Sequence, residues 1–368
     1  MNQIIRIGVD TSKSVFQLHG VDASEQPVLR KQLRRRAFLA FFAKLPPTRI
    51  GLEACGGSHH WGRELRALGH EAVLLPPQYA KQYLMRGKND PADAEAICEA
   101  MGRPRMQKRF VPIKSAEQQA AQMLIGTRDR LVRNRTQLSN AIRGYATEFG
   151  VVAAKGLDKI EPLLARIAGD PTIPTLAKDL FAAHGAEYAQ LKAQLRAIEA
   201  KLTAWHRASE LSQRLAKIPT IGMIGATRLA IKVTNPKAFR SGRDFAAWIG
   251  LTPKDHSTAG KLRLGVITRA GDESLRQSLV LGATATVQQT RKGRGDPSPW
   301  LAGLVKRKPP KLVAVALANK TARIAWKLMV SGEAYKPQVP SSRLVAATGS
   351  VAPGSPRQGR SAPPSAVA

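Results

Sequence analysis

The chain has 368 residues, and its 58 Lys and Arg outnumber 26 Asp and Glu, which gives a formal net charge of +32 at pH 7. An excess of this size attracts polyanions, above all nucleic acid, and therefore argues against most small-molecule enzymes. With no run of eighteen apolar residues and only two cysteines, the sequence also excludes a membrane span, a disulfide framework and a four-cysteine zinc site. We therefore expect a cytoplasmic protein with no membrane partner.

Residues 1–110 alternate short apolar runs with helical stretches, which is typical of a mixed α/β domain. The expected elements are strands at 4–10, 15–21 and 27–33, a helix at 35–44, a strand at 49–53, a helix at 58–68, a strand at 71–75 and a helix from 91 to 101. The first three strands predict a meander, and the later order predicts a mixed sheet with helices on its faces. Pro91 suits the first helical position, with Asp90 before it as the N-cap.

Residues 111–210 lose the strand signals and gain apolar residues spaced three, four or seven apart, which predicts two long helices. The seam of the first helix is Leu124, Leu131, Leu138 and Tyr145, and that of the second is Tyr188, Leu191, Leu195, Ile198, Leu202 and Trp205. Such seams fit packing within a helical bundle or a coiled coil between subunits, and the sequence leaves both open. Arg130, Arg133 and Arg135 lie on the other faces of the first helix, where they suit a nucleic-acid backbone.

The remaining chain divides into a basic, mainly helical domain at residues 211–337 and a tail at residues 338–368. The tail is rich in Pro, Ser, Ala and Gly and has no hydrophobic periodicity. Such a composition buries too little apolar surface to offset the entropy of ordering the chain, so we expect the tail to be disordered.

Four acidic residues of the first domain lie at the end of an expected strand or at the start of an expected helix. Asp10 ends the first strand, Glu53 ends the strand at 49–53, and Asp90 and Asp93 stand about one helical turn apart. Asp90 alone fits a helix cap and Asp10 alone fits a turn, whereas Glu53 at the end of an apolar strand is costly to desolvate without a partner. Divalent cations explain all four acids at once, because they offset the repulsion and promote phosphodiester chemistry.

Two hydroxyl residues, Ser257 and Thr258, lie in a glycine-containing loop of the third domain. The loop is surrounded by basic residues, namely Lys254, Lys261, Arg263 and Arg269. A serine in this setting could attack phosphorus, with the cations offsetting the charge of the transferring phosphoryl group. From the residues alone, a hydroxyl that merely contacts phosphate is the better interpretation, so both roles stay open.

Three motifs of the first domain resemble the signatures of the DEDD-type insertion-sequence transposases, the family numbered one hundred and ten. The matching segments are Gly8-Val9-Asp10-Thr11-Ser12-Lys13, Leu52-Glu53-Ala54-Cys55-Gly56 and Lys88-Asn89-Asp90-Pro91-Ala92-Asp93-Ala94. The resemblance implies a RuvC-like nuclease domain with an RNase H-type fold. It also implies that Asp10, Glu53, Asp90 and Asp93 are a metal-binding tetrad for Mg²⁺ or Mn²⁺.

The third domain resembles the second conserved domain of the same family. Residues 215–222 look like a helix-hairpin-helix, which implies phosphate contacts at Thr220 and Gly222, while a plain helix–turn–helix packing element is the alternative. Residues 257–260 resemble the motif of the family's nucleophilic serine, with Lys261, Arg263 and Arg269 as implied nucleic-acid contacts. Many relatives read Ser-Ser-Gly-Gly where this chain reads Ser-Thr-Ala-Gly, so Ser257 is the expected nucleophile and Thr258 the reserve.

The resemblance, which extends to about residue 336, implies a bacterial transposase or site-specific recombinase. It implies cutting and rejoining of double-stranded DNA through a phosphoserine link, with a structured guide RNA from the same element. The implied partners are element-end DNA, target DNA, this RNA and further copies of the chain in a dimer or tetramer, at the nucleoid.

Two other classes of protein stay open. A metal-dependent, structure-selective nuclease similar to a junction resolvase would need the acids but not Ser257. A non-catalytic nucleic-acid scaffold would need only the positive charge. An aromatic content of 5% argues against a protein that binds single strands by base stacking.

Overall fold

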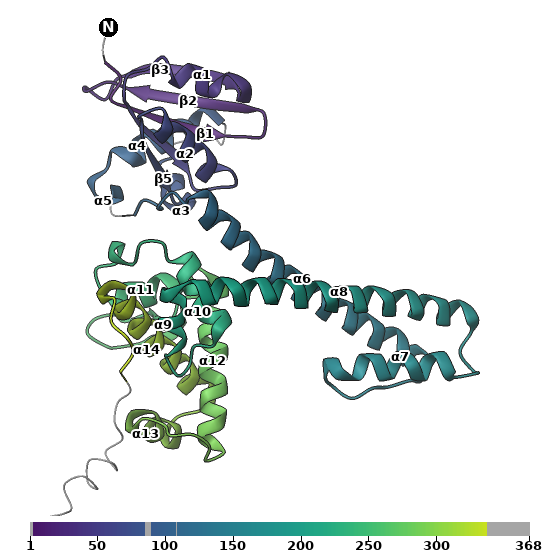
Figure 1. The fold of residues 1–368 in the computed structure, drawn as a ribbon. Helices are drawn as coiled ribbons and strands as arrows, with labels where there is room; N and C mark the ends of the chain where they lie inside the picture. The colour runs from purple at the N-terminus through teal and green to yellow at the C-terminus, as the bar shows by residue number, and fades with distance from the viewer. Residues whose placement is uncertain (1–2, 85–89, 108, 337–368) are drawn as a thin grey trace, which may run out of the picture. The chain divides into compact units, whose positions relative to one another are not determined.

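The computed structural model describes residues 3–84, 90–107 and 109–336, and Figure 1 shows its elements. By its internal contacts the chain forms two compact units. The first joins Met1–Gln213 to Met223–Arg240, and the second joins Arg214–Gly222 to the chain from Ser241 onward. The domain boundaries predicted near residues 110, 210 and 337 stay predictions, and the predicted disorder of residues 338–368 lies outside the described residues.

The first unit begins with a five-stranded mixed sheet of strand order β3-β2-β1-β4-β5 (Figure 1). The strands are β1 (Arg6–Thr11), β2 (Val15–Val21), β3 (Pro27–Arg34), β4 (Arg49–Glu53) and β5 (Glu71–Leu75). The first three form an antiparallel meander, whereas β4 and β5 run parallel to β1. The predicted meander and mixed sheet are therefore confirmed, and β4 and β5 have the predicted bounds.

One face of the sheet is covered by short helices, namely η1 (Arg35–Ala37), α1 (Phe38–Phe42) and α2 (Ser58–Ala67). Aliphatic residues of this face are fully buried, among them Ile7, Val9, Ile50 and Leu52. Phe16, Phe38 and Trp61 meet there edge to face, with ring centroids 4.8 to 5.2 Å apart. The aromatic cluster joins the helices to the sheet and accounts for this half of the core.

The opposite face is covered by α4 (Asp90–Gly102), with α3 (Pro77–Ala80), η2 (Lys81–Tyr83) and α5 (Pro104–Gln107) nearby. Its core includes Val73 and Leu75 of β5 and Ile97 and Met101 of α4. The sequence predicted Asp90 as an N-cap, but Asp90 is itself the first residue of α4. Residue 89 lies outside the described residues, so the cap of this helix is not assigned.

Two long helices follow, as predicted: α6 (Ala116–Glu148) and α8 (Thr175–Ala208), linked by η3 (Leu157–Lys159) and α7 (Ile160–Gly169). They pack against each other within the chain, and most residues of the predicted seams are buried between them. Leu124, Ile198 and Trp205 are partly buried, whereas Tyr145 is 54% exposed and stacks on His184. A coiled coil between subunits stays a prediction.

Helix α10 (Met223–Lys232) returns to the first unit after α9 (Glu210–Ala216) and is followed by η4 (Pro236–Ala238). Arg228 of α10 forms an ion pair with Asp129 of α6. One residue earlier on α6, Arg128 pairs with Glu199 of α8 at 2.7 Å. These half-buried pairs orient α10 and α8 on α6.

The second unit is mainly helical, as predicted. It contains α11 (Gly242–Ile249), β6 (Pro253–Asp255), β7 (Leu264–Ile267), α12 (Glu273–Arg291), α13 (Pro299–Arg307) and α14 (Pro310–Ser331). Helices α12 and α14 pack along each other, and β6 and β7 form a hairpin that the sequence analysis did not predict. Among the described residues of both units, no helix combines the length and hydrophobicity that a bilayer crossing requires.

Candidate active site

The pleat of the sheet places two of the predicted acids on one face. Gly8 and Asp10 occupy alternate positions of β1, and Gly51 and Glu53 do the same on the neighbouring β4. Alternate residues of a strand point to the same side, so both carboxylates share a face with the two glycines. Because β1 and β4 run parallel, Asp10 and Glu53 also lie at the same edge of the sheet.

A glycine on β1 lets α4 approach the sheet closely. A Cβ added to Gly8 would lie 2.2 Å from the carbonyl oxygen of Ala94 and 2.4 Å from the amide nitrogen of Cys98. The backbone of α4 therefore rests directly on β1, with no side chain between them. This contact brings Asp90 and Asp93, in the first turns of α4, to the end of β1.

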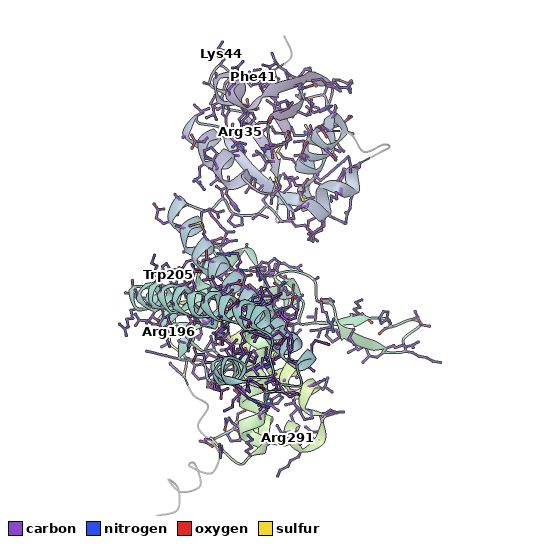
Figure 2. All side chains as sticks on the ribbon, turned by 90° about the vertical axis from the view of Figure 1, so that its right-hand side faces the viewer. Arg35, Phe41, Lys44, Arg196, Trp205 and Arg291 are labelled. Carbon is purple, nitrogen blue, oxygen red and sulfur yellow. The ribbon has the colours of Figure 1, made fainter. Side chains whose placement is uncertain are left out.

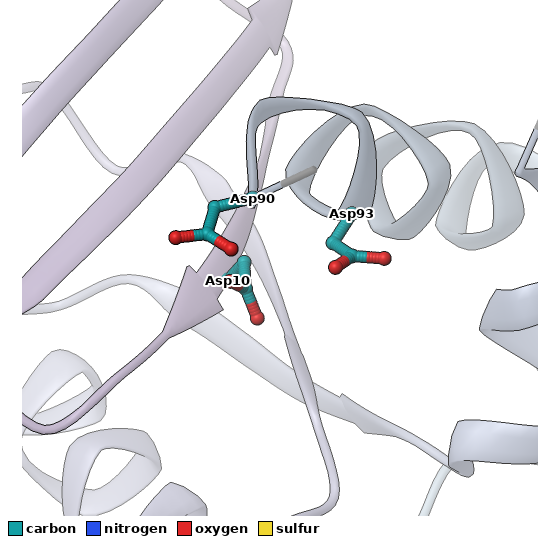
Figure 3. Close-up of side chains that lie close together, drawn as sticks. All are labelled: Asp10, Asp90 and Asp93. Carbon is teal, nitrogen blue, oxygen red and sulfur yellow. The ribbon is translucent and has the colours of Figure 1, made fainter. Parts of the chain in front are cut away.

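Asp10, Asp90 and Asp93 form a cluster of three carboxylates (Figure 3). One carboxylate oxygen from each residue lies within 4.8 Å of those from the other two. Burial, followed by the negative charges of Asp93, Asp90 and Glu53, raises the pKa of Asp10 to about 6. Glu53 is not part of the three-residue cluster, although its charge acts on Asp10. The structure thus brings together three of the four predicted acids and keeps the fourth nearby.

The donors of this cluster fit a divalent cation. All three are carboxylate oxygens, which are the hard ligands that Mg²⁺ and Mn²⁺ prefer. In the described part of the chain, neither histidine nor cysteine belongs to the cluster. After burial, the negative charges of the neighbouring acids raise the pKa of Asp10. A bound cation would offset these charges.

Ser257 lies in the unpredicted hairpin of the second unit. Its side chain is exposed, and its Oγ accepts a hydrogen bond from the backbone N–H of Arg263 at 3.0 Å. Its own backbone N–H donates to Oδ1 of Asp255 at 2.9 Å. Hydrogen bonding by the side chain of Ser257, and then by its backbone N–H, lowers the pKa of Asp255. The serine hydroxyl is therefore oriented by its own hairpin.

The tip of the hairpin is a tight turn from Thr258 to Lys261. The two residues between them, Ala259 and Gly260, both have positive φ, 48° and 77°. The Lys261 N–H donates to the Thr258 carbonyl at 2.9 Å, and the pattern is that of a type I′ turn. Glycine adopts such φ values without strain and alanine does not, so Ala259 is strained here.

The base of the hairpin is fixed by two glycines that interlock with backbone. A Cβ on Gly250 would lie 2.1 Å from the carbonyl oxygen of Ala270, and a Cβ on Gly271 would lie 1.7 Å from that of Trp248. Both glycines also have positive φ, 82° and 79°. Arg269, itself at φ 56°, donates its N–H to the Gly250 carbonyl at 3.2 Å. The segment after β7 is thus held against the end of α11.

The other predicted nucleic-acid contacts differ in exposure. Arg130 and Arg133 of α6 are exposed and Arg135 is half-buried, whereas the hairpin residues Lys261, Arg263 and Arg269 are all exposed. Gly222 is exposed as well.

Thr220 is turned inward. It is buried, and its hydroxyl shares a 2.6 Å hydrogen bond with the hydroxyl of Thr321 on α14. Its carbonyl oxygen lies 2.0 Å from where Gly282 of α12 would carry a Cβ. The Thr220 hydroxyl is therefore used in packing within the unit, and the phosphate contact expected at Thr220 stays a prediction.

Two glycines that position the acids were not predicted from the sequence. Gly8 and Gly51 touch no reacting group, yet they set how closely α4 approaches β1 and β4. A signal was present in the sequence, because Gly8-Val9-Asp10 and Gly51-Leu52-Glu53 repeat one pattern of glycine, apolar residue and acid. On a strand, that pattern places each acid on the same face as a glycine, which has no side chain to keep a helix away.

A mixed sheet with carboxylates clustered at the ends of its parallel strands, followed by helices, is consistent with an RNase H-like domain of the DEDD type. Comparison with protein families gives the same class. Residues 7–150 match the DEDD transposases of the IS110 type, and residues 212–296 match the Transposase IS116/IS110/IS902 family. The chain belongs to this family of transposases.

Individual relatives agree over nearly the whole described chain. The y4pF/y4sB protein of Sinorhizobium fredii is 67% identical over 91% of this chain and 87% of its own length. The transposase for insertion sequence element IS1328 of Yersinia enterocolitica is 36% identical over 91% of this chain and 99% of its own. The transposase for IS1111A of Coxiella burnetii is 35% identical, over 91% and 92%. The resemblance found in the motifs is thereby confirmed.

Proposed function

We propose that this transposase cuts and rejoins double-stranded DNA at the ends of an insertion sequence, through a phosphoserine link and with the help of divalent metal. The observation that carries the proposal is the cluster of Asp10, Asp90 and Asp93 at the sheet edge. It occurs in a chain whose relatives include transposases named for insertion sequences. A net charge of +32 supports a polyanionic substrate.

The acids have the role of holding the metal. Asp10, Asp90 and Asp93 supply the clustered oxygens. Glu53, on the same face of the sheet, adds a fourth negative charge beside them. When bound, Mg²⁺ or Mn²⁺ neutralises charge on the scissile phosphate and stabilises the leaving oxygen. The raised pKa of Asp10 means that protons compete with the metal below about pH 6.

Ser257 has the role of nucleophile. Its Oγ forms a bond to the scissile phosphorus while the bond from phosphorus to a deoxyribose oxygen breaks; the serine loses its proton and the departing oxygen gains one. One phosphoester replaces another, so the strand can be rejoined without an external energy source. The N–H of Arg263 at 3.0 Å orients the hydroxyl, and the exposed side chains of Lys261 and Arg263 add positive charge.

The partners that we propose are DNA, a structured guide RNA that selects the DNA sites, and further copies of the chain in a dimer or tetramer, in the cytoplasm at the nucleoid. RNA guidance and oligomerisation rest on the family resemblance. Exposed Arg130 and Arg133, with half-buried Arg135, support binding to a nucleic-acid backbone along α6. Replacing all three with Gln should flatten the salt dependence of binding. An unchanged slope would assign this helix face to protein contacts.

The decisive experiment incubates the purified chain with element-end DNA, with and without candidate RNA and Mg²⁺, and looks for covalent protein–DNA adducts. Asp10→Asn and Glu53→Gln should lower cleavage about 10²- to 10³-fold, since metal stabilisation contributes several kcal/mol and each 1.36 kcal/mol is tenfold. Folding should be intact, because each change removes repulsion between acids. Full activity of both variants at limiting Mg²⁺ would rule out the tetrad.

Ser257→Ala separates recombinase from nuclease. It should abolish the adduct and recombination while DNA binding stays near normal, because one hydroxyl adds little to a contact dominated by cations. Thr258→Ala should be mild, costing about 0.5–1.5 kcal/mol at most. An adduct that survives Ser257→Ala and is lost with Thr258→Ala would make Thr258 the nucleophile. Cleavage unaffected by either change would favour the alternative, a structure-selective nuclease that uses the acids and water.

A further inference from the structure

A basic pocket of about 660 Å³ lies at the edge of the sheet, on the first unit, and the proposed reaction does not use it. It is formed where the β1–β2 turn meets the end of β3 and the short helices that follow. The residues that line it are Lys13, Ser14, Val15, Arg34, Arg35, Arg36, Leu39 and Trp61. Half of them are cationic, and none is acidic.

The directions of the strands place this pocket at the same end of the sheet as the acids, although Leu39 and Trp61 of its lining belong to the helices on the opposite face from α4. β1 ends at Thr11, β2 starts at Val15, and β3 ends at Arg34, which is the register partner of Val15. Lys13 follows Asp10 by three residues, and three residues span at most about 11 Å. At a rise of about 3.4 Å per nucleotide, the distance between Asp10 and Lys13 therefore corresponds to at most about three nucleotides of a nucleic-acid strand.

The cations of the pocket stand without counter-charges. In the described chain, no carboxylate forms an ion pair with Lys13, Arg34 or Arg36, and all three side chains are exposed. Elsewhere in the same unit arginines do have partners, as Arg6 has Glu25 and Arg128 has Glu199. Four like charges gathered around one hollow repel each other, and a polyanion would relieve that repulsion.

Arg35 is held in place for this role. Its guanidinium lies over the ring of Trp61, 4.8 Å from the centroid, and Trp61 is only 6% exposed. A buried ring gives the guanidinium a fixed support and leaves its N–H groups to face a ligand. The backbone N–H of Arg35 also donates to the Ser14 carbonyl at 2.9 Å, which ties the two walls of the pocket together. Figure 2 marks Arg35 on the sheet domain.

We propose that this pocket binds the sugar–phosphate backbone of the DNA strand that carries the scissile phosphate, a few nucleotides away from the acids. The identity of the strand rests on the proposed function; the binding of phosphates does not. The pocket offers cations but no exposed aromatic face, because Trp61 lies beneath Arg35. It therefore offers no platform for base stacking, and its cationic lining suits phosphates. Its role is to fix the strand in register with Asp10.

The test measures binding of the full chain without Mg²⁺, so that cleavage plays no part. The pocket variant combines Arg34→Gln, Arg35→Gln and Arg36→Gln. The matched control combines Arg30→Gln, Lys31→Gln and Lys44→Gln, which remove the same charge from exposed residues of the same domain outside the pocket. The probes are a duplex DNA, a single-stranded DNA and an RNA of one sequence. Thermal unfolding checks that each variant is folded.

The pocket variant should bind duplex DNA about tenfold more weakly at 0.1 M salt. Its log–log salt slope should be shallower by about 2 to 3, since each lost phosphate contact removes about 0.9. The control variant should change the slope by less than about 1. As an independent readout, bound DNA should protect Lys13 from acetylation and leave Lys44 reactive.

Three results would overturn the proposal. Equal losses in the pocket and control variants would mean that only the overall charge matters. A loss confined to the RNA probe would assign the pocket to a guide strand. Unprotected Lys13 would show that DNA does not enter. None of these depends on cleavage: Asp10→Asn and Ser257→Ala should bind DNA as the unmodified chain does, so a failure of the proposed reaction would leave the pocket result intact.

Discussion

The acid cluster and the Ser257 hairpin carry the two halves of the proposed chemistry, yet they are built in opposite ways. Asp10 lies on an interior strand, with the backbone of α4 resting on the same face of β1. Ser257 lies in an exposed loop between strands of three and four residues. The carboxylates are therefore positioned by a packed core, and the serine by one turn and two glycines. A core tolerates little change, whereas a hairpin can move without unfolding its unit.

The largest effect should come from Gly8→Ala, which tests the core side of this comparison. The added methyl would meet the backbone of Ala94 at 2.2 Å and would push α4 off β1. We expect a loss of about 3 kcal/mol in unfolding free energy, the upper range for overpacking, together with loss of metal binding. Urea unfolding and Mn²⁺ titration measure both. Gly126→Ala, on open helical surface, is the control and should not destabilise.

The hairpin side is tested by Gly271→Ala against Gly293→Ala. Both glycines have positive φ, 79° and 68°, so both changes carry a similar backbone penalty of about 1 kcal/mol. Only Gly271 would place its methyl 1.7 Å from the Trp248 carbonyl, whereas Gly293 faces open space. Gly271→Ala should therefore lose about 1 kcal/mol more in thermal unfolding and should lose the covalent adduct. Equal effects would mean that the hairpin base does not position Ser257.

The two regions should also differ in their response to acid. In the sheet domain, burial, aided by Lys114 and Arg63, lowers the pKa of His59 from 6.5 to about 4. Its Nδ1 accepts the N–H of Lys114 at 3.2 Å, so the folded state holds the neutral ring. Between about pH 6.5 and 4 the unfolded chain binds the extra proton at His59, so the contribution of His59 to stability falls as the pH falls. Asp10, whose pKa is raised, contributes with the opposite sign.

This acid response is measurable by urea unfolding at pH 7 and pH 5. The loss attributable to His59 should be about 1 kcal/mol, reduced from the full shift because the ring is only half-buried. His59→Gln should remove that part of the loss. Asp255 in the hairpin has its pKa lowered by Ser257 but is exposed, so Asp255→Asn should leave the pH dependence of stability unchanged. The reverse pattern would contradict the assignment.

The smallest effect concerns the hairpin tip. Ala259→Gly should relieve the strain of φ 48° and stabilise the turn by about 0.5–1 kcal/mol. Amide hydrogen exchange at Lys261 and Arg263, whose N–H groups are bonded within the hairpin, should slow about two- to fivefold. Gly260→Ala should speed the same exchange. If neither variant changes exchange, the turn does not limit the mobility of the loop.

The first half of the fold was predictable because its signals are local and strong. The apolar runs at 49–53 and 71–75 are buried parallel strands, and their bounds agree with the structure. Three of the four acids converge because strand ends and a helix start meet at one edge, which the order of elements indicates. The sequence could not show that Glu53 lies outside the cluster, since this depends on a side-chain position within the packed site.

The serine hairpin was not predictable for the opposite reason. β6 has the sequence Pro-Lys-Asp and is exposed throughout, so it has no buried face to produce an alternating pattern. Its conformation is held by the hydrogen-bonded turn from Thr258 to Lys261 and by the interlocked glycines at its base. Tyr145 and Thr220 also differ from prediction. Tyr145 was expected in the seam of a helix but is exposed, and Thr220 was expected to contact phosphate but is buried. Tertiary packing decides both, and it cannot be read from the local sequence.

The order in which the chain passes between the two units matters for its synthesis. Residues 223–240 return to the first unit, where Ile231 of α10 joins Ile125 and Leu202 in one core cluster. A nascent chain that ends before α10 therefore lacks part of that core. The segment Arg214–Gly222 belongs to the second unit, and the partner of its Thr220 hydroxyl, Thr321, is synthesised about a hundred residues later. The core of the first unit can therefore be completed only after residue 240 has been synthesised, and a chain truncated at residue 213 would lack part of it.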